Sequence, residues 1–227
     1  MAAAFSLLRA VPDDMPEIVD LLWTVFTAQR TRDAFLGPDT PEGRKACVER
    51  YGKDMREHPA DYWLKVVDNA SGKIIAISNW RIHPTVAPEP YENMDLPWLD
   101  YDKEYQKKIV GILHDIVNAR KRLYTQPHIQ LCILGTDPSF ARRGAGAMMM
   151  KWGCNLADHL FLPMWIEASH DGGKLYEAFG FSHFEVKAEG QEGTIMRREA
   201  RPSQIQGGKV LAPEVVRADG PELKTIS

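Results

Sequence analysis

The sequence has few cysteines, no long apolar run and little net charge in its 227 residues. Its three cysteines are Cys47, Cys132 and Cys154; they form no C-x-x-C pair, which argues against a disulfide framework and against a cysteine-based metal site. We therefore expect a reducing, cytoplasmic location and no metal. No segment approaches the roughly 20 apolar residues of a membrane span, and the start does not resemble a signal peptide, so we expect no membrane partner.

The charge balance excludes another class of partner. With 28 Lys and Arg against 31 Asp and Glu, the formal net charge is −3. A general nucleic-acid binder would carry a strong basic excess, so we expect no nucleic-acid partner. The apolar fraction of 44% is enough for a sizeable core without disulfides.

Alternating hydrophobic patterns predict an α/β protein with a mixed sheet. The expected strands are 5–10, 62–67, 73–82, 128–136, 164–168, 183–188 and 193–197. The expected helices are 15–29, 41–56, 103–122, 144–160 and 170–181. We assign residues 1–197 to a single domain, with a helical insertion at 84–127, and residues 198–227 to a polar C-terminal extension.

One junction between a predicted strand and a predicted helix has unusual chemistry. The apolar strand 128–136 leads through Asp137-Pro138 into the segment "FARRGAGAMMMKWG", which starts at Phe140. A helix N-terminus presents unpaired N–H groups and a partial positive charge, and both attract phosphate. Small residues let the backbone approach an anion, and arginines add charge-assisted bonds. The segment therefore predicts a pyrophosphate cradle made by Arg142, Arg143, Gly144, Ala145, Gly146 and Ala147.

This segment has other interpretations. An ordinary helix start with two solvated arginines has the same local composition. The P-loop pattern is absent, since no Gly-Lys-Ser/Thr follows the first glycine at the required spacing. The dinucleotide pattern G-x-G-x-x-G would need glycine at position 149, which is Met149.

The run from Ala141 to Gly146 resembles motif A of the GNAT family of N-acetyltransferases, [Q/R]-x-x-G-x-[G/A], with alanine in its first position. Downstream, "LYEAFGF", which starts at Leu175, is similar to the family's motif B. Upstream, "LLRAVPDDMPEIVDLL" is similar to the family's first strand and helix. The three motifs occur in the family's order, and the resemblance covers residues 5–197.

This resemblance implies a mostly antiparallel, mixed sheet with a splayed central pair of parallel strands, flanked by helices. The splayed strands would be 128–136 and 163–169, and acetyl-CoA would lie between them as co-substrate. Backbone groups of Ile133, Leu134, Gly135 and Thr136 would hold the pantetheine arm. An isolated glycine in a strand often marks a bulge, so we expect a backbone distortion at Gly135 near the thioester.

The resemblance also implies transfer of an acetyl group to an amine by direct attack. Tyr176, in motif B, would be the general acid that protonates the leaving thiolate; the alternative is that Tyr176 only packs. Many family members have a basic glutamate on the central strand, which this chain lacks. Glu167 is our candidate base. His83, Asp137 and a water chain are the alternatives. The non-catalytic interpretation of Glu167 is an ordinary solvated or paired acid.

The acceptor would be a small-molecule amine, bound by a monomer or a homodimer. Two sets of residues are candidates for its site. An aromatic wall would comprise Phe26, Phe35, Trp80, Tyr91 and Trp98, and Asp95 and Asp100 would attract a cationic amine. The alternatives are an acyl-CoA-binding module without catalysis, O-acyl transfer and thioester hydrolysis, because a fold does not settle a function.

Overall fold

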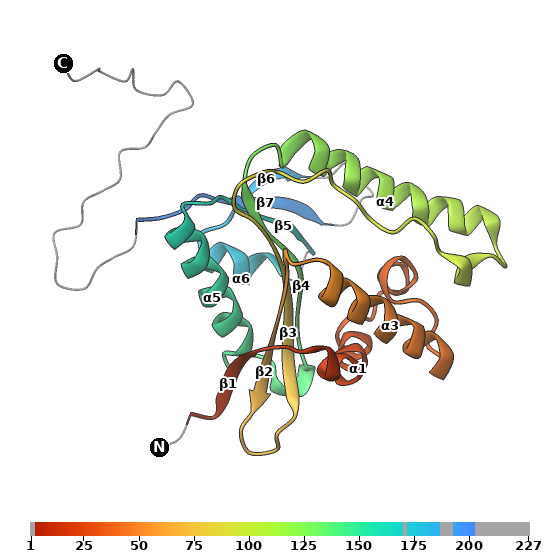
Figure 1. The fold of residues 1–227 in the computed structure, drawn as a ribbon, viewed down its shortest axis with the longest axis horizontal. Helices are drawn as coiled ribbons and strands as arrows, with labels where there is room; N and C mark the ends of the chain where they lie inside the picture. The colour runs from red at the N-terminus through yellow and green to blue at the C-terminus, as the bar shows by residue number, and fades with distance from the viewer. Residues whose placement is uncertain (1–2, 170–171, 187–192, 203–227) are drawn as a thin grey trace.

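The computed structural model describes residues 3–169, 172–186 and 193–202, and its centre is a seven-stranded sheet (Figure 1). The strand order is β1-β2-β3-β4-β5-β7-β6. The strands are β1 (Phe5–Arg9), β2 (Asp61–Asp68), β3 (Ile74–His83), β4 (His128–Thr136), β5 (Met164–Ala168), β6 (Ser182–Val186) and β7 (Thr194–Arg198). All neighbouring pairs are antiparallel except β4 and β5, so the predicted mixed, mostly antiparallel sheet is confirmed.

Helices cover both faces of this sheet. The longer ones are α1 (Met15–Val25), α3 (Pro41–Glu57), α4 (Lys103–Leu123) and α5 (Ala145–Leu160), and the shorter ones are α2 (Gln29–Thr31) and α6 (Gly173–Ala178). Figure 1 shows α5 and α6 on one side of the sheet, α1 and α3 on the other, and α4 above α3. No helix in the described ranges combines the length and apolarity that crossing a bilayer requires.

Side chains alternate between these two faces along the central strands. On β3, Trp80 is fully buried against α5, where a Cβ added at Gly153 would lie 2.4 Å from its ring. Ile77 and Trp63 instead join the core beneath α1 and α3. We call the face that α5 covers the CoA face, because it carries the predicted cradle. We call the face that α1 and α3 cover the acceptor face.

The two parallel strands separate soon after they start. They form only three Cα pairs, from Ile129–Met164 to Leu131–Ile166. Beyond this point β4 continues to Thr136 with pairing to β3 alone, while β5 pairs only with β7. The predicted splay is therefore present, and the β5-facing edge of β4 has no strand beside it after Leu131.

The expected bulge at Gly135 is wrong in position. Gly135 is in regular register with Ile77, and the irregularity instead falls at Cys132, because Asn79 pairs with Ile133 while Trp80 pairs with Leu131. Gly135 has another reason to be small, since an added Cβ would lie 2.9 Å from Cγ1 of Val25 on α1. The glycine permits close helix packing, and the extra residue of the bulge is the cysteine.

The segment between β3 and β4 forms a roof over the acceptor face. It contains a short 3-10 turn, η3 (Pro97–Leu99), followed by α4. Leu96, Leu99, Ile109 and Leu113 are buried in one cluster with Ala34, so the roof packs on the segment that follows α1. At its other end α4 reaches Trp165 of β5, whose ring is stacked on that of Tyr124, the residue that ends α4, at 4.7 Å.

Candidate functional site

The predicted cradle is a sharply turned loop that leads directly into α5. Arg142 and Gly144 both have left-handed backbones, with φ of 63° and 98°. Gly144 occupies the N-cap position, and no side chain caps the helix. A left-handed conformation is readily adopted by glycine and strained for arginine, so the loop is held in a special shape.

This loop leaves a series of backbone donors unused. Within the described part of the chain, none of the N–H groups from Arg142 to Ala147 donates a hydrogen bond, and the first paired amide is Met148, which donates to Gly144. Unpaired amides at a helix start carry partial positive charge and suit an anion. The arginines are exposed beside them, and the Arg143 guanidinium lies 5.2 Å from the Phe140 ring centroid.

The cradle is anchored at its upstream end by Asp137. This carboxylate accepts hydrogen bonds from Lys73 at 2.7 Å, from the Ser139 hydroxyl at 2.6 Å and from the Ser139 amide at 2.9 Å. Lys73 and Ser139 lower the pKa of Asp137 to about 2. A carboxylate held in this way is a structural support and a weak base.

The cradle, the open edge of β4 and motif B meet at Gly146. A Cβ added there would lie 3.4 Å from Cδ2 of Leu175 on α6 and 3.8 Å from Oγ1 of Thr136 at the end of β4. The residues predicted to hold pantetheine, Ile133 to Thr136, form the stretch of β4 that β5 no longer pairs. A linear ligand with a phosphate end can therefore run from the cradle along this edge.

Tyr176 lies on α6 beside this edge. Its side chain packs against Phe181, with ring centroids 6.2 Å apart, and the residue is 8% exposed. Its hydroxyl has no hydrogen-bond partner among the residues that the structure describes. Burial raises the pKa of Tyr176 to about 12, so the phenol keeps its proton at neutral pH.

Glu167 lies on β5, one residue beyond the last pair with β4. Arg120 donates to both of its carboxylate oxygens at 2.8 Å, Tyr124 donates at 2.6 Å and Gln130 at 3.2 Å. Burial alone would raise the pKa of Glu167, but these donors outweigh it and the pKa lies below its ordinary value. The candidate base is therefore an ionised, fully occupied carboxylate in a buried ion pair.

The ion pair belongs to a wider polar network under the roof. Arg120 also donates to Glu92, which precedes η3. Arg81 on β3 lies 3.8 Å from Glu92 and donates to Asp61 at 3.2 Å. Burial raises the pKa of the neighbouring Cys132 to about 12, so its thiol stays protonated at neutral pH.

Most members of this network were missed in the sequence. Arg120 stands in "NARKR", which resembles an ordinary charged helix end. A signal was nevertheless present, because Ile109, Leu113 and Val117 form the buried stripe of α4, and Arg120 and Tyr124 continue it at the same spacing. A charged residue at a stripe position indicates a buried partner.

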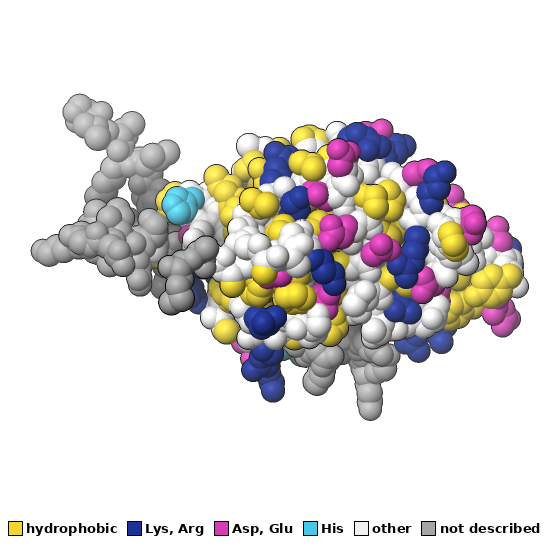
Figure 2. Space-filling model, turned by 90° about the horizontal axis from the view of Figure 1, so that it is seen from below, with side chains coloured by type: hydrophobic (Ala, Val, Ile, Leu, Met, Phe, Trp, Pro, Cys, Tyr) yellow, Lys and Arg dark blue, Asp and Glu magenta, His cyan; other side chains and the backbone are white. Residues whose placement is uncertain are grey.

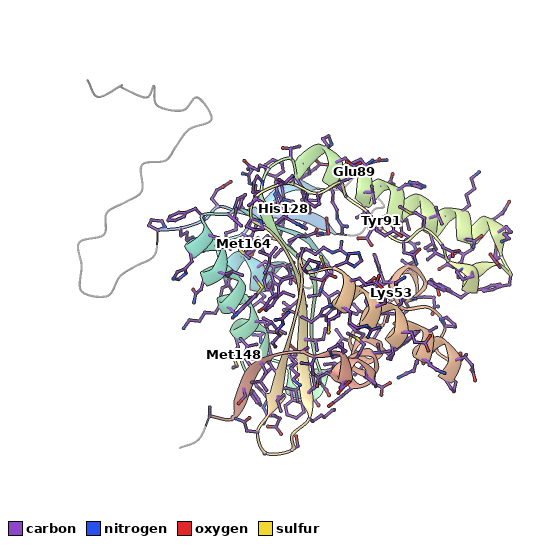
Figure 3. All side chains as sticks on the ribbon, in the orientation of Figure 1. Lys53, Glu89, Tyr91, His128, Met148 and Met164 are labelled. Atoms are coloured by element: carbon purple, nitrogen blue, oxygen red, sulfur yellow. The ribbon has the colours of Figure 1, made fainter. Side chains whose placement is uncertain are left out.

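His83, another candidate base, lies at the far end of β3 beside His128, with ring centroids 5.3 Å apart. Burial lowers the pKa of His83 to about 4, assisted by His128 and Arg81. Figure 3 shows His128 at the end of β4 nearest α4, and Met148 on α5 at the other end. His83 therefore lies at the opposite end of β4 from the cradle.

The expected aromatic wall is brought together only in part. Phe35 and Trp98 are half-buried and pack on the roof cluster, and Phe26 is half-buried against the α1 core, whereas Trp80 is on the opposite face and belongs to the core. Tyr91 is 71% exposed on the segment beside α4, which Figure 3 shows opposite α3. Of the acids expected to attract the amine, Asp95 is exposed and Asp100 pairs with Lys103.

A cavity of about 360 Å³ lies elsewhere, between β6, β7 and Arg201. It is near the C-terminal end of α5, where Asp158 binds Arg198. The 16-residue length of α5 separates this end from the cradle by about 24 Å. Figure 2 shows side chains of both charges interspersed on the surface seen from below, and no group of three His, Cys, Asp or Glu residues in the described ranges could hold a metal.

Comparison with known proteins places this geometry in a structural class. No family model matches the sequence, and no curated protein matches it significantly. Many solved structures are similar in fold, and three of them illustrate the class. A histone acetyltransferase HPA2-related protein from Corynebacterium glutamicum has a TM-score of 0.58 and 16% identity, covering 89% of this chain and 100% of that one. The arylalkylamine N-acetyltransferase 2 of Aedes aegypti has a TM-score of 0.55 and 15% identity, covering 87% and 99%.

The third structure is the C-terminal condensation domain of Ebony in complex with β-alanyl-dopamine. It has a TM-score of 0.60 and 11% identity, and the match covers 86% of this chain and 99% of that domain. At these identities the likeness concerns the fold. It agrees with the mixed, mostly antiparallel sheet, its one parallel pair and the helices that flank it. The chain therefore has the fold of the GNAT acetyltransferases.

Proposed function

We propose that the protein transfers an acetyl group from acetyl-CoA to the nitrogen of a small amine. The observation that carries this proposal is the run of six unpaired amides from Arg142 to Ala147, next to the open edge of β4. The amides and arginines bind the pyrophosphate of CoA. The pantetheine arm then adds to β4 as a strand would, which brings the thioester to the bulge at Cys132.

The chemistry requires two functions from the protein: stabilisation of the oxyanion and protonation of the leaving thiolate. The amine nitrogen attacks the thioester carbon, the carbon–sulfur bond breaks, and the acetyl group ends on nitrogen. The developing oxyanion is stabilised by a backbone N–H near Ile133 or Leu134, beside the bulge. Tyr176 donates its proton to the leaving thiolate; its place in motif B and the absence of another hydrogen-bond partner among the described residues support this role.

The proton lost by the amine goes to water in this account. Glu167 was our candidate base from the sequence, but four donors hold it as an ion. If Glu167 accepted a proton, the buried guanidinium of Arg120 would lose its counter-charge, which is costly. We therefore assign Glu167 to positioning: it fixes the roof over the site. The reacting form is then the small neutral fraction of the amine that is present at physiological pH, and water takes the proton.

An amine with an aromatic group fits the acceptor face best. Phe35 and Trp98 offer half-buried rings packed on the roof cluster, and Phe26 offers one at the C-terminal end of α1. Two of the similar structures are an arylalkylamine N-acetyltransferase and a domain holding β-alanyl-dopamine. Neither comparison assigns a substrate here, but both make tyramine, tryptamine and dopamine sensible first acceptors. An acyl-CoA-binding module, O-acyl transfer and thioester hydrolysis remain the competing functions.

Thermal unfolding with CoA, acetyl-CoA, NAD and ATP tests the cradle. A ligand at one hundred times its Kd stabilises the native state by about 2.7 kcal/mol, enough to raise the melting temperature by a few degrees. We expect a shift with CoA and acetyl-CoA only. Gly146→Glu should abolish it, because it puts a carboxylate among the amides. Gly111→Glu, on α4 where an added Cβ meets nothing within 4 Å, is the matched control. A shift that survives in Gly146→Glu would contradict the assigned site.

A further inference from the structure

One buried polar side chain on the acceptor face is not explained by the fold. Asn79 on β3 is 3% exposed, and its Nδ2 is buried without a hydrogen-bond partner. Within the part of the chain that the structure describes, its carboxamide makes no hydrogen bond. An unsatisfied buried amide costs about 1–3 kcal/mol, and such groups are few in native proteins.

The position of Asn79 coincides with the reaction centre. Its register partner on β4 is Ile133, which adjoins the bulge, and its partner on β2 is Trp63. Ile77 and Trp63 belong to the core beneath α1 and α3, and Asn79 alternates with Ser78 and Trp80, so it is on the acceptor face. The carboxamide is therefore next to the point where β4 and β5 part.

The neighbouring charged groups do not need Asn79, although the indole N–H of Trp63, its partner on β2, is also buried without a hydrogen-bond partner among the described residues. Arg81, two residues along the same face, is bound by Asp61 and lies near Glu92. Arg120 and Glu167 satisfy each other. Since the charges beneath the roof are paired among themselves, Asn79 is not a member of that network. Among the residues that the structure describes it has no partner, so its hydrogen-bonding groups are available to a bound ligand.

We propose that the Asn79 carboxamide binds the acceptor amine and orients it towards the thioester. This inference rests on the proposed acetyl transfer. The carboxamide oxygen accepts a hydrogen from the attacking nitrogen, which directs the nitrogen lone pair at the acyl carbon. The amide N–H₂ donates to an oxygen of the reacting pair. A carboxamide has both a donor and an acceptor, and a half-turn of the amide exchanges them, so either orientation serves.

Asn79→Leu separates this role from a structural one, with Ser78→Ala as the matched control. Ser78 is the adjacent residue, is fully buried, and accepts a hydrogen bond from Trp80 at 2.9 Å. Ser78→Ala should therefore lower the melting temperature, because Trp80 loses its partner. Asn79→Leu keeps a similar side-chain volume and removes no hydrogen bond to the described residues, so we expect an equal or higher melting temperature.

Kinetics provide the second measurement. Thiol release from acetyl-CoA is followed with an amine that the wild type acetylates, chosen from tyramine, tryptamine and dopamine. We expect Asn79→Leu to lower kcat/KM for the amine at least tenfold, with CoA affinity unchanged within twofold. Ser78→Ala should keep the wild-type kcat/KM for the amine.

The outcomes separate the two proposals. A fall in melting temperature for Asn79→Leu as large as that for Ser78→Ala would overturn the inference, as would an unchanged kcat/KM for the amine. In both cases CoA binding by the wild type would leave the acetyltransferase proposal standing. If the wild type bound no CoA, or acetylated none of these amines and no other, the proposed function would fall and this inference with it.

Discussion

Arg120 and Glu167 form a buried, bidentate ion pair that joins helix α4 to strand β5. The guanidinium Nε and Nη2 donate to the two carboxylate oxygens at 2.8 Å each, and the Arg120 side chain is 7% exposed. Tyr124, which follows α4, donates to the same carboxylate at 2.6 Å. The roof over the acceptor face is therefore attached next to the point where the parallel strands separate.

Removing one partner of this pair should destabilise the protein strongly. Arg120→Met leaves Glu167 buried without its cation, and we expect the free energy of unfolding to fall by about 3–5 kcal/mol. Chemical denaturation measures the change. Arg122→Met is the control on the same helix, because the Arg122–Glu185 pair is exposed and solvent-screened and should contribute little to stability. Equal losses for the two variants would contradict the importance of the buried pair.

Gly135 is predicted to be intolerant of the smallest side chain. An added Cβ would lie 2.9 Å from Val25 Cγ1, so Gly135→Ala forces β4 and α1 apart, and we expect a loss of about 1–3 kcal/mol. Gly111→Ala has open space within α4 and should stabilise the protein by about 0.5–1 kcal/mol. Denaturation midpoints of the two variants should move in opposite directions. A stabilising Gly135→Ala would contradict the prediction, because it would mean that Val25 moves away from the added Cβ at little cost.

His83 should reduce stability in mildly acidic solution. Its folded pKa is lowered to about 4, whereas an unfolded histidine titrates near 6.5. Below pH 6.5 the unfolded chain gains a proton that the folded chain does not, so stability falls from about pH 6.5 to 4. His83→Gln should weaken this fall, whereas His114→Gln, at an exposed position of α4, should not. Urea midpoints across this pH range measure the fall in stability. Parallel curves for His83→Gln and the wild type would disprove that the lowered pKa of His83 causes it.

Tyr176→Phe tests the proposed general acid. The hydroxyl has no partner among the described residues and the ring contact with Phe181 is kept, so we expect an unchanged melting temperature. A general acid typically contributes about 10²–10⁴-fold, and turnover should fall within that range while CoA affinity is retained. Unchanged turnover would mean that Tyr176 only packs.

The sequence predicts most of the fold because its patterns are local. The strands 128–136 and 164–168 have the expected bounds, and α3, α4 and α5 differ from the expected ranges by about one residue. The helix expected at 15–29 ends at Val25, because Phe26 has an extended backbone and Arg32 donates to its carbonyl at 2.6 Å. That contact depends on how the chain returns, which hydrophobic periodicity does not encode. The C-terminal extension lies outside the described residues beyond position 202.

The proposed cradle lies in one segment, whereas the contacts of Glu167 bring several segments together. The cradle is a single run of six residues, so composition alone is enough to predict a phosphate site there. The partners of Glu167 come from α4, the end of that helix and β4, and no local pattern relates Arg120 to position 167. Trp80 was placed on the wrong side because the face of a strand residue depends on which helix covers it, here α5. The bulge at Cys132 was missed because no glycine marks it.

The most direct test of the account is the fate of an isotopically labelled acetyl group. The wild-type protein is incubated with labelled acetyl-CoA and each of tyramine, tryptamine and dopamine, and the products are identified by mass spectrometry. We predict label in an amide on the amine nitrogen, released with an equal amount of CoA thiol. Label found only in acetate would indicate thioester hydrolysis, label on a hydroxyl would indicate O-acyl transfer, and no release of thiol would indicate a binding module. Each of these three results would contradict N-acetyl transfer.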